Sequence, residues 1–177
     1  MMTRLRIFLF SLLALMAAGT AEAAAPTITR AVALNSDPIN LVVFPKAIQG
    51  AIVTYTVTVK NPNVVTTFGS FVLTDSINTI AVPQGAEYYV GTGTNNPFVY
   101  TDGVLGLGGS GLAYTFTSLS STTDSVAFSC DSGATWTCTP QPDADGYDYH
   151  VTNIRITFTN SFAAGGAFTF ALKARVR

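Results

Sequence analysis

The chain has 177 residues, of which 48% are hydrophobic and only 11% are charged, and its formal net charge is −1 at pH 7. Globular domains carry about 25% charged residues, whereas disordered chains combine low hydrophobicity with high net charge. The composition therefore excludes disorder, and the lack of a basic excess argues against nucleic acid and anionic membranes as partners.

Residues 1–23 have the three parts of a secretory signal peptide. Arg4 and Arg6 give a positive start, Ile7–Ala18 is an apolar run, and Ala21-Glu22-Ala23 offers small residues for cleavage. The run is too short to span a bilayer comfortably, since a helix needs about twenty residues, although an uncleaved anchor is the alternative. We expect a mature chain without a membrane span that is secreted to the periplasm, the cell surface or the medium.

Residues 24–47 form a β-prone extension ahead of the main domain. Its strands are expected at Ile28–Leu34 and Leu41–Phe44. The segment at residues 26–44 could pair within its own sheet, or it could add to the exposed edge of a neighbouring copy. The sequence leaves both pairings open.

Residues 48–177 are predicted to form an all-β domain because apolar residues recur at every second position. The clearest runs are 53–59, 154–158 and 168–176, and Ala163-Ala164-Gly165-Gly166 predicts a hairpin turn between the last two. Short strands with Gly and Pro in their connections are typical of a single antiparallel, immunoglobulin-like β-sandwich. Further strands are expected at Phe71–Thr74, Ala86–Val90, Leu112–Thr117, Ser125–Cys130 and Thr135–Cys138.

Cys130 and Cys138 flank the turn signal Asp131-Ser132-Gly133. A hairpin about this turn would place the thiols on facing strands, and export favours their oxidation to a disulfide. Two free thiols or a metal site are the alternatives. Trp136, between the cysteines, is expected to pack over the disulfide, although it could also be an exposed platform for a ligand.

Asp143, Asp145 and Asp148 are the best candidate ligands for a cofactor. Three carboxylates at i, i+2 and i+5 around Gly146 could offer hard oxygen atoms to calcium. The loop lacks the glutamate that ends an EF-hand loop, and Asp145-Gly146 is also an ordinary turn signal. A calcium site and a plain turn are both open, and no other cofactor is expected.

Catalytic residues are not predicted anywhere in the chain. His150 is the single histidine, and no serine lies in a Gly-x-Ser-x-Gly elbow. The acids stand mainly at turns, where aspartate bonds to the backbone. Aromatic residues around Asn95-Asn96-Pro97 could line a carbohydrate groove but are better explained as core. They are Tyr88, Tyr89, Phe98 and Tyr100.

Two stretches at the ends of the main domain resemble a known family. Gly50 followed by Val53-Thr54-Tyr55-Thr56-Val57-Thr58-Val59, within Ile48–Asn61, resembles the opening strand of the conserved-repeat domain of prokaryotic surface proteins (domain of unknown function eleven). Val72-Leu73-Thr74-Asp75 resembles its next strand, without the usual Leu/Ile-Pro pair. Val151–Phe158 and Phe162–Phe170 resemble the closing hairpin, and Pro140–Asp148 resembles the loop before it.

The resemblance covers residues 48–177 and implies an immunoglobulin-like fold in an extracellular setting, often as tandem repeats of adhesive or surface-layer proteins. It implies no catalytic residues, and here the domain occurs once. We therefore expect a non-catalytic structural or cell-surface protein whose partners are further copies of itself or other envelope proteins, assembling into a surface layer or fibre. The alternative is a monomeric extracellular module that binds carbohydrate or an envelope protein.

Overall fold

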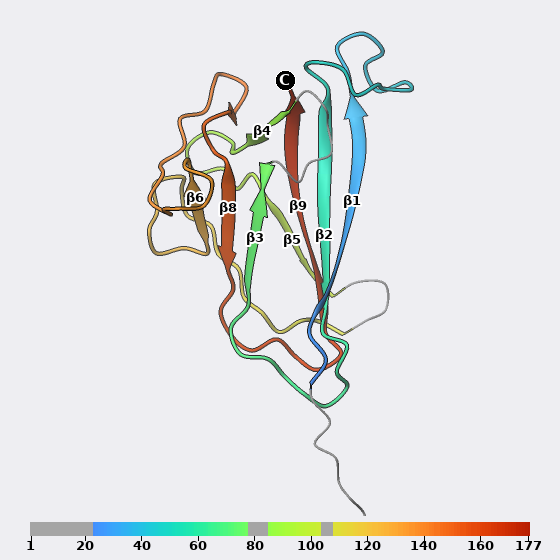
Figure 1. Cartoon of the computed structure of the whole chain (residues 1–177), viewed down its shortest axis with the longest axis vertical. Coiled ribbons are helices and arrows are strands. Elements are labelled where there is room, and N and C mark those ends of the chain that lie inside the picture. The colour runs from blue at the N-terminus through green and yellow to red at the C-terminus, as the bar shows by residue number, and fades with distance from the viewer. Residues whose placement is uncertain (1–22, 78–84, 104–107) are drawn as a thin grey trace, which may run out of the picture.

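The computed structural model describes residues 23–77, 85–103 and 108–177 (Figure 1). Residues 1–22 of the predicted signal peptide lie outside this part of the chain. The described residues contain no helix with the length and apolar character that a bilayer crossing requires. Their strands are β1 (Thr27–Ser36), β2 (Ile52–Lys60), β3 (Val72–Ser76), β4 (Ala86–Tyr89), β5 (Val99–Asp102), β6 (Val126–Ser129), β7 (Tyr147–Asp148), β8 (Asn153–Thr157) and β9 (Ala167–Val176).

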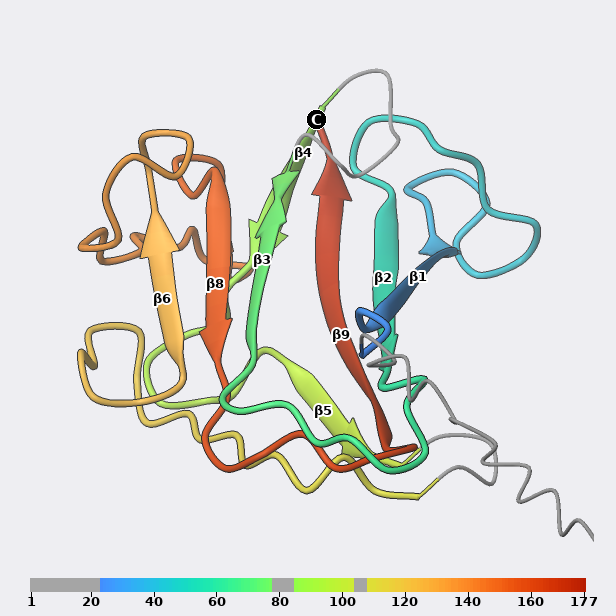
Figure 2. The same cartoon turned by 60° about the horizontal axis from the view of Figure 1, so that its bottom comes forward.

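The strands form two antiparallel sheets, which confirms the predicted all-β class. The larger sheet has the order β1-β2-β9-β4-β7, and β5 pairs with β9 beyond the end of β4. The smaller sheet has the order β3-β8-β6. Both views place β1 and β6 at opposite borders of the molecule (Figures 1 and 2).

The two sheets share one hydrophobic core. Val53, Tyr55, Val57 and Val59 of β2 are buried, as the alternation in the sequence predicts, and the threonines between them are half-buried. Aromatic rings from both sheets and their connections fill the centre, with ring centroids 4.8 Å apart for Phe158–Phe168 and 5.5 Å apart for Phe98–Phe170. Aromatic pairs add to the free energy gained from burying their surface.

Three predicted strands do not form. At Leu41–Phe44 the backbone turns, because Leu41 and Phe44 have positive φ values of 55° and 54° that no strand accommodates. Leu112–Thr117 and Thr135–Cys138 each contribute only one bridge, Ala113 to Thr159 and Cys138 to Phe128. The structure adds β5 and the two-residue β7, which the sequence pattern does not indicate.

The predicted closing hairpin is also wrong, since β8 and β9 belong to different sheets. Gly165 has the expected positive φ, 67°. The turn is not held by a partner strand: its Gly165 N–H donates to Asn63 O, and Asn61 Nδ2 donates to Ala163 O at 3.0 Å. The chain therefore crosses the end of the core from one sheet to the other, anchored by the segment that follows β2.

Residues 27–36 of the N-terminal extension pair within their own chain. β1 runs antiparallel to β2 from Thr27–Lys60 to Leu34–Val53. Gly50, just before β2, has a φ of 83° and lies against Pro38, where a Cβ atom would be 2.8 Å from Pro38 Cγ. A side chain at position 50 would therefore push away the loop that links β1 to β2.

Candidate functional site

The two cysteines form the predicted disulfide between Cys130 and Cys138, whose Cα atoms lie 5.8 Å apart. Cys138 N also donates to Phe128 O at 3.3 Å, so the end of this loop runs beside β6. Asp131 holds the turn by accepting hydrogen bonds from Ser129 Oγ and from the backbone and side chain of Thr135. These bonds lower the pKa of Asp131 from 3.8 to about 2, the bond from Ser129 contributing most.

A pocket of about 410 Å³ opens at this border of the molecule. Its lining includes Ala127 of β6 and Arg155 and Thr157 of β8. Val126 and Phe128 of β6 also line it, together with most residues of 119–125 and with residues 136–139 around Cys138. We call this feature the Arg155 pocket.

Arg155 and Trp136 form the main charged and aromatic pair of this pocket. The Arg155 Cζ atom lies 4.5 Å from the centroid of the Trp136 ring, within the range of a cation–π contact. Ala127 is the register partner of Arg155 on the neighbouring strand, and its small side chain leaves room beside the guanidinium group. Within the described residues, Arg155 has no ion pair with an acid. The sequence offered Trp136 as a candidate platform for a ligand. It predicted Arg155 only as an outward-facing residue of a strand.

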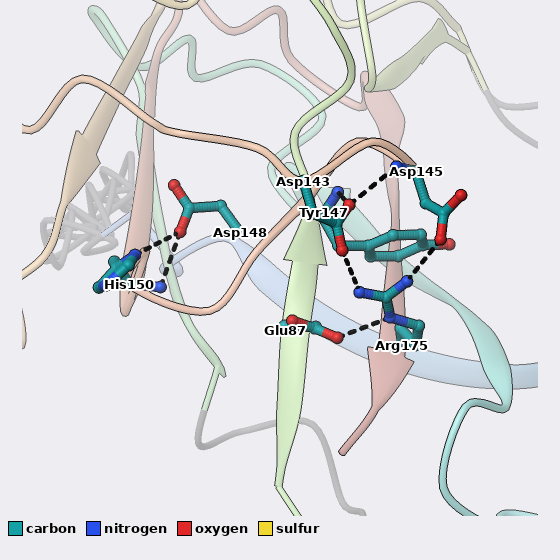
Figure 3. A network of polar contacts seen from close by, with 7 residues as sticks. All are labelled: Glu87, Asp143, Asp145, Tyr147, Asp148, His150 and Arg175. Carbon is teal, nitrogen blue, oxygen red and sulfur yellow. Dashed lines mark hydrogen bonds and ion pairs between the residues drawn. The ribbon is translucent and has the colours of Figure 1, made fainter.

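A second arginine, Arg175 of β9, lies against the loop that carries Asp143 and Asp145 (Figure 3). Its guanidinium group bonds Glu87 Oε1 at 2.6 Å and Asp145 Oδ2 at 3.1 Å, and it also bonds Asp143. The centroid of the Tyr147 ring lies 4.3 Å from the Arg175 Cζ atom. The backbone bond from Tyr147 and the contact with Arg175 hold the pKa of Asp143 below its ordinary value.

The predicted calcium ligands are only partly brought together. Asp143 and Asp145 meet at Arg175, whereas Asp148 points to the other side of the loop (Figure 3). The buried Asp148 carboxylate accepts hydrogen bonds from Gln141 N at 2.5 Å and His150 N at 2.8 Å. The described residues contain no group of three or more His, Cys, Asp or Glu residues arranged to hold a metal ion. An ion between Asp143 and Asp145 would have to displace Arg175.

His150 lies beside Asp148 at the surface. Its Nδ1 atom is 3.1 Å from Asp148 Oδ1, and its ring centroid lies 3.7 Å from that of the tilted Tyr149 ring. These contacts hold the backbone just before β8. They are the contacts expected of a polar residue at the start of a strand. Of the aromatic residues considered for a carbohydrate groove, Tyr88 and Phe98 are buried in the core, as preferred from the sequence.

The loop between β1 and β2 presents apolar side chains to solvent. Asp37 organises the loop by accepting hydrogen bonds from Ile39 N, Asn40 N and Lys46 N at 2.6–2.7 Å. Large apolar side chains that the fold leaves exposed gather in β1 and this loop, and we call them the N-terminal contact surface. They are Ile28, Val32, Ile39, Leu41, Val42, Val43 and Phe44.

Comparisons of the chain with protein-family models, with curated proteins and with solved structures found no match. The resemblance to the surface-protein repeat domain therefore stays a prediction from the residues of the sequence. Two features of the structure bear on the function, the Arg155 pocket and the N-terminal contact surface.

Proposed function

We propose that the chain is a non-catalytic structural protein, exported to the cell surface as an immunoglobulin-like β-sandwich, that assembles with further copies of itself. The N-terminal contact surface carries the proposal. Of the twelve large apolar side chains exposed in the described residues, seven lie between Ile28 and Phe44, and Phe44 is 88% exposed. Groups of exposed large apolar side chains mark contact sites in many proteins.

The edge of β1 supplies a way for two copies to join. β1 pairs with β2 on one side, and its other side forms the border of the larger sheet. The strand is ten residues long and contains neither Lys nor Pro, the residues that commonly protect an edge from pairing. An antiparallel pair of β1 strands would extend the larger sheet through a twofold axis, which is the usual symmetry of a dimer.

The side chains of β1 fit the same contact. Ile28 and Val32 are register partners of the buried Val59 and Tyr55, so they share the core-facing side of the sheet, yet they are 47% and 49% exposed. Arg30, between them, lies 3.9 Å from the buried carboxylate of Asp75. Because Asp75 offsets its charge, two copies can bring their β1 strands together without strong repulsion.

The loop after β1 would add to this contact. In Figures 1 and 2 it projects past the end of β1, on the side away from β9. In an antiparallel β1 pair, the loop of one copy reaches the start of β1 in the other, where Ile28 is exposed. Burial of these apolar side chains would supply the favourable free energy of association, at roughly 25 cal/mol for each Å² of apolar surface.

The test is the assembly state of the chain produced with its own N-terminal signal. Light scattering and negative-stain microscopy should show dimers that form more readily at higher protein concentration. The variant with Val42→Asp and Val43→Asp should shift the protein to monomers. A matched control carries Val64→Asp and Val65→Asp, which are 84% and 86% exposed in another loop, and should assemble like the parent chain.

Two outcomes would count against this proposal. A parent chain that stays monomeric at every concentration would favour the monomeric binding module instead. Equal assembly of the two variants would show that the N-terminal contact surface is not the interface.

A further inference from the structure

We propose that the Arg155 pocket binds a carboxylate-bearing sugar, such as a uronic acid residue of an acidic polysaccharide. The inference is independent of self-assembly, because the pocket lies at the β6 border and the N-terminal contact surface lies at the β1 border (Figures 1 and 2). It rests on a charge without an acidic partner, a stacking aromatic ring and a hydroxyl-rich lining.

Among the described residues, Arg155 lacks the carboxylate partners that Arg175 and Arg30 have, and unlike Arg177 it lines a pocket. Arg175 also lies over an aromatic ring, yet three carboxylates surround it, and Arg30 lies near Asp75. Arg155 is half-buried at the pocket, and within the part of the chain that the structure describes its guanidinium group lies over the Trp136 ring and forms no ion pair. A partly desolvated cation gains most from an anion that its planar fork can bind through two parallel hydrogen bonds, which a carboxylate does.

The Trp136 ring limits how that fork can move. The Arg155 Cζ atom lies 4.5 Å from the ring centroid, and this contact holds the guanidinium group at the pocket, where its N–H groups can donate to a ligand. The ring lies on a segment that the disulfide and the Cys138–Phe128 bridge hold beside β6. The pocket is thus formed before a ligand arrives, which reduces the entropic cost of binding.

The rest of the lining suits a sugar rather than a purely apolar anion. Its volume of about 410 Å³ lies in the range of small-molecule sites. Hydroxyl groups donate and accept hydrogen bonds, as the hydroxyls of a sugar do. Side-chain hydroxyls come from both loops and from β8: Ser120, Ser121, Thr122, Thr137, Thr139 and Thr157.

Asp124 sets the direction in which such a ligand would lie. This carboxylate lines the pocket and accepts hydrogen bonds from Thr117 N at 2.9 Å and Val126 N at 3.0 Å. It repels a ligand carboxylate and accepts from a ligand hydroxyl. A uronic acid would therefore place its carboxylate at Arg155 and its hydroxyls toward Asp124.

The test is a calorimetric titration with oligogalacturonate, and with a neutral galactose oligomer of the same length as the comparison. The acidic oligomer should bind more tightly, and added salt should weaken it because the contact includes an ion pair. Arg155→Gln should reduce the affinity by about tenfold to a hundredfold, the usual loss for a charge-assisted hydrogen bond. Arg155→Lys, which keeps the charge but loses the planar fork, should fall between the two.

Arg177 offers a matched control. Its Cζ atom lies 5.1 Å from the Tyr149 ring, so it is another arginine on an aromatic ring, but it does not line the pocket. Arg177→Gln should bind the oligomer like the parent chain, and all variants should keep the parent near-ultraviolet circular dichroism. Failure of the parent chain to bind, equal binding of the neutral oligomer, or an equal loss in the Arg155→Gln and Arg177→Gln variants would overturn the proposal.

Discussion

Two loops of this protein are each held by an aspartate that accepts backbone hydrogen bonds, yet they expose different kinds of side chain. In the loop after β1, Asp37 accepts hydrogen bonds from backbone N–H groups, and in the loop after β6, Asp131 does the same. The first loop exposes apolar side chains and has no covalent closure. The second is closed by a disulfide and exposes mainly polar residues beside the Arg155 pocket.

The difference shows that the same backbone bonding by an aspartate can present different kinds of exposed side chain. An aspartate fixes the backbone in both cases, through local bonding that aspartate favours in turns. The exposed side chains then decide what each loop can contact: another apolar surface in the first case, and a polar ligand in the second. Three changes test how strongly each loop is coupled to the folded core.

The largest contrast should come from truncating a phenylalanine in the core and one in the loop after β1. Phe170→Ala removes a buried ring that stacks on Phe98, and it should lower the free energy of unfolding by about 3–5 kcal/mol. Phe44→Ala, at an 88% exposed position, should change it by less than about 0.5 kcal/mol. Denaturation in urea at low protein concentration measures both. A large loss for Phe44→Ala would mean that the loop packs on its own core.

Removing the disulfide should have the next largest effect. Replacing Cys130 and Cys138 with serine should cost about 2–3 kcal/mol, because the unfolded chain gains freedom when a short loop is opened. Reducing agent should lower the stability of the parent chain by a similar amount and leave the double variant unchanged. Amide signals of the loop at residues 37–46 should not move in either case. An unchanged unfolding free energy in the double variant would contradict the prediction.

Acid should produce the smallest effect and open the second loop first. The folded-state pKa of Asp131 is lowered from 3.8 to about 2, so its contribution is present above pH 3.8 and is lost as the pH falls through about 2. Burial acts to raise the pKa of Asp37, but hydrogen bonds from Asn40, Lys46 and Ile39 lower it further than that of Asp131. Amide signals near Thr135 should therefore shift at a higher pH than those near Lys46. The reverse order would contradict the comparison.

The strands in which apolar and polar residues alternate regularly could be predicted from the sequence. Alternation identified β2, β8 and β9 within one or two residues, and the turn between the cysteines predicted their disulfide. It could not assign β8 and β9 to different sheets, because a glycine turn after a strand is equally compatible with a hairpin and with a crossing between sheets. β7 was missed because two residues show no period.

The candidate sites were harder to predict because they depend on distant contacts. The spacing of Asp143, Asp145 and Asp148 suggested shared ligands, yet an arginine on β9 draws two of them together and the third bonds backbone N–H groups. Trp136 and Arg155 are far apart in the sequence, and only the placement of the disulfide loop beside β6 brings them into contact. The sequence offered Trp136 as a platform for a ligand, but nothing in it placed Arg155 against the same ring.

The position of β9 at the centre of the larger sheet has a consequence for how the chain is made. β9 pairs with β2, β4 and β5, and its partners in β2 lie more than 100 positions away in the sequence. Until β9 leaves the ribosome, the larger sheet remains in separate pieces and its core stays open. Folds with such distant pairings form in roughly milliseconds to seconds. A nascent chain of this design therefore cannot complete its larger sheet until β9 has been made.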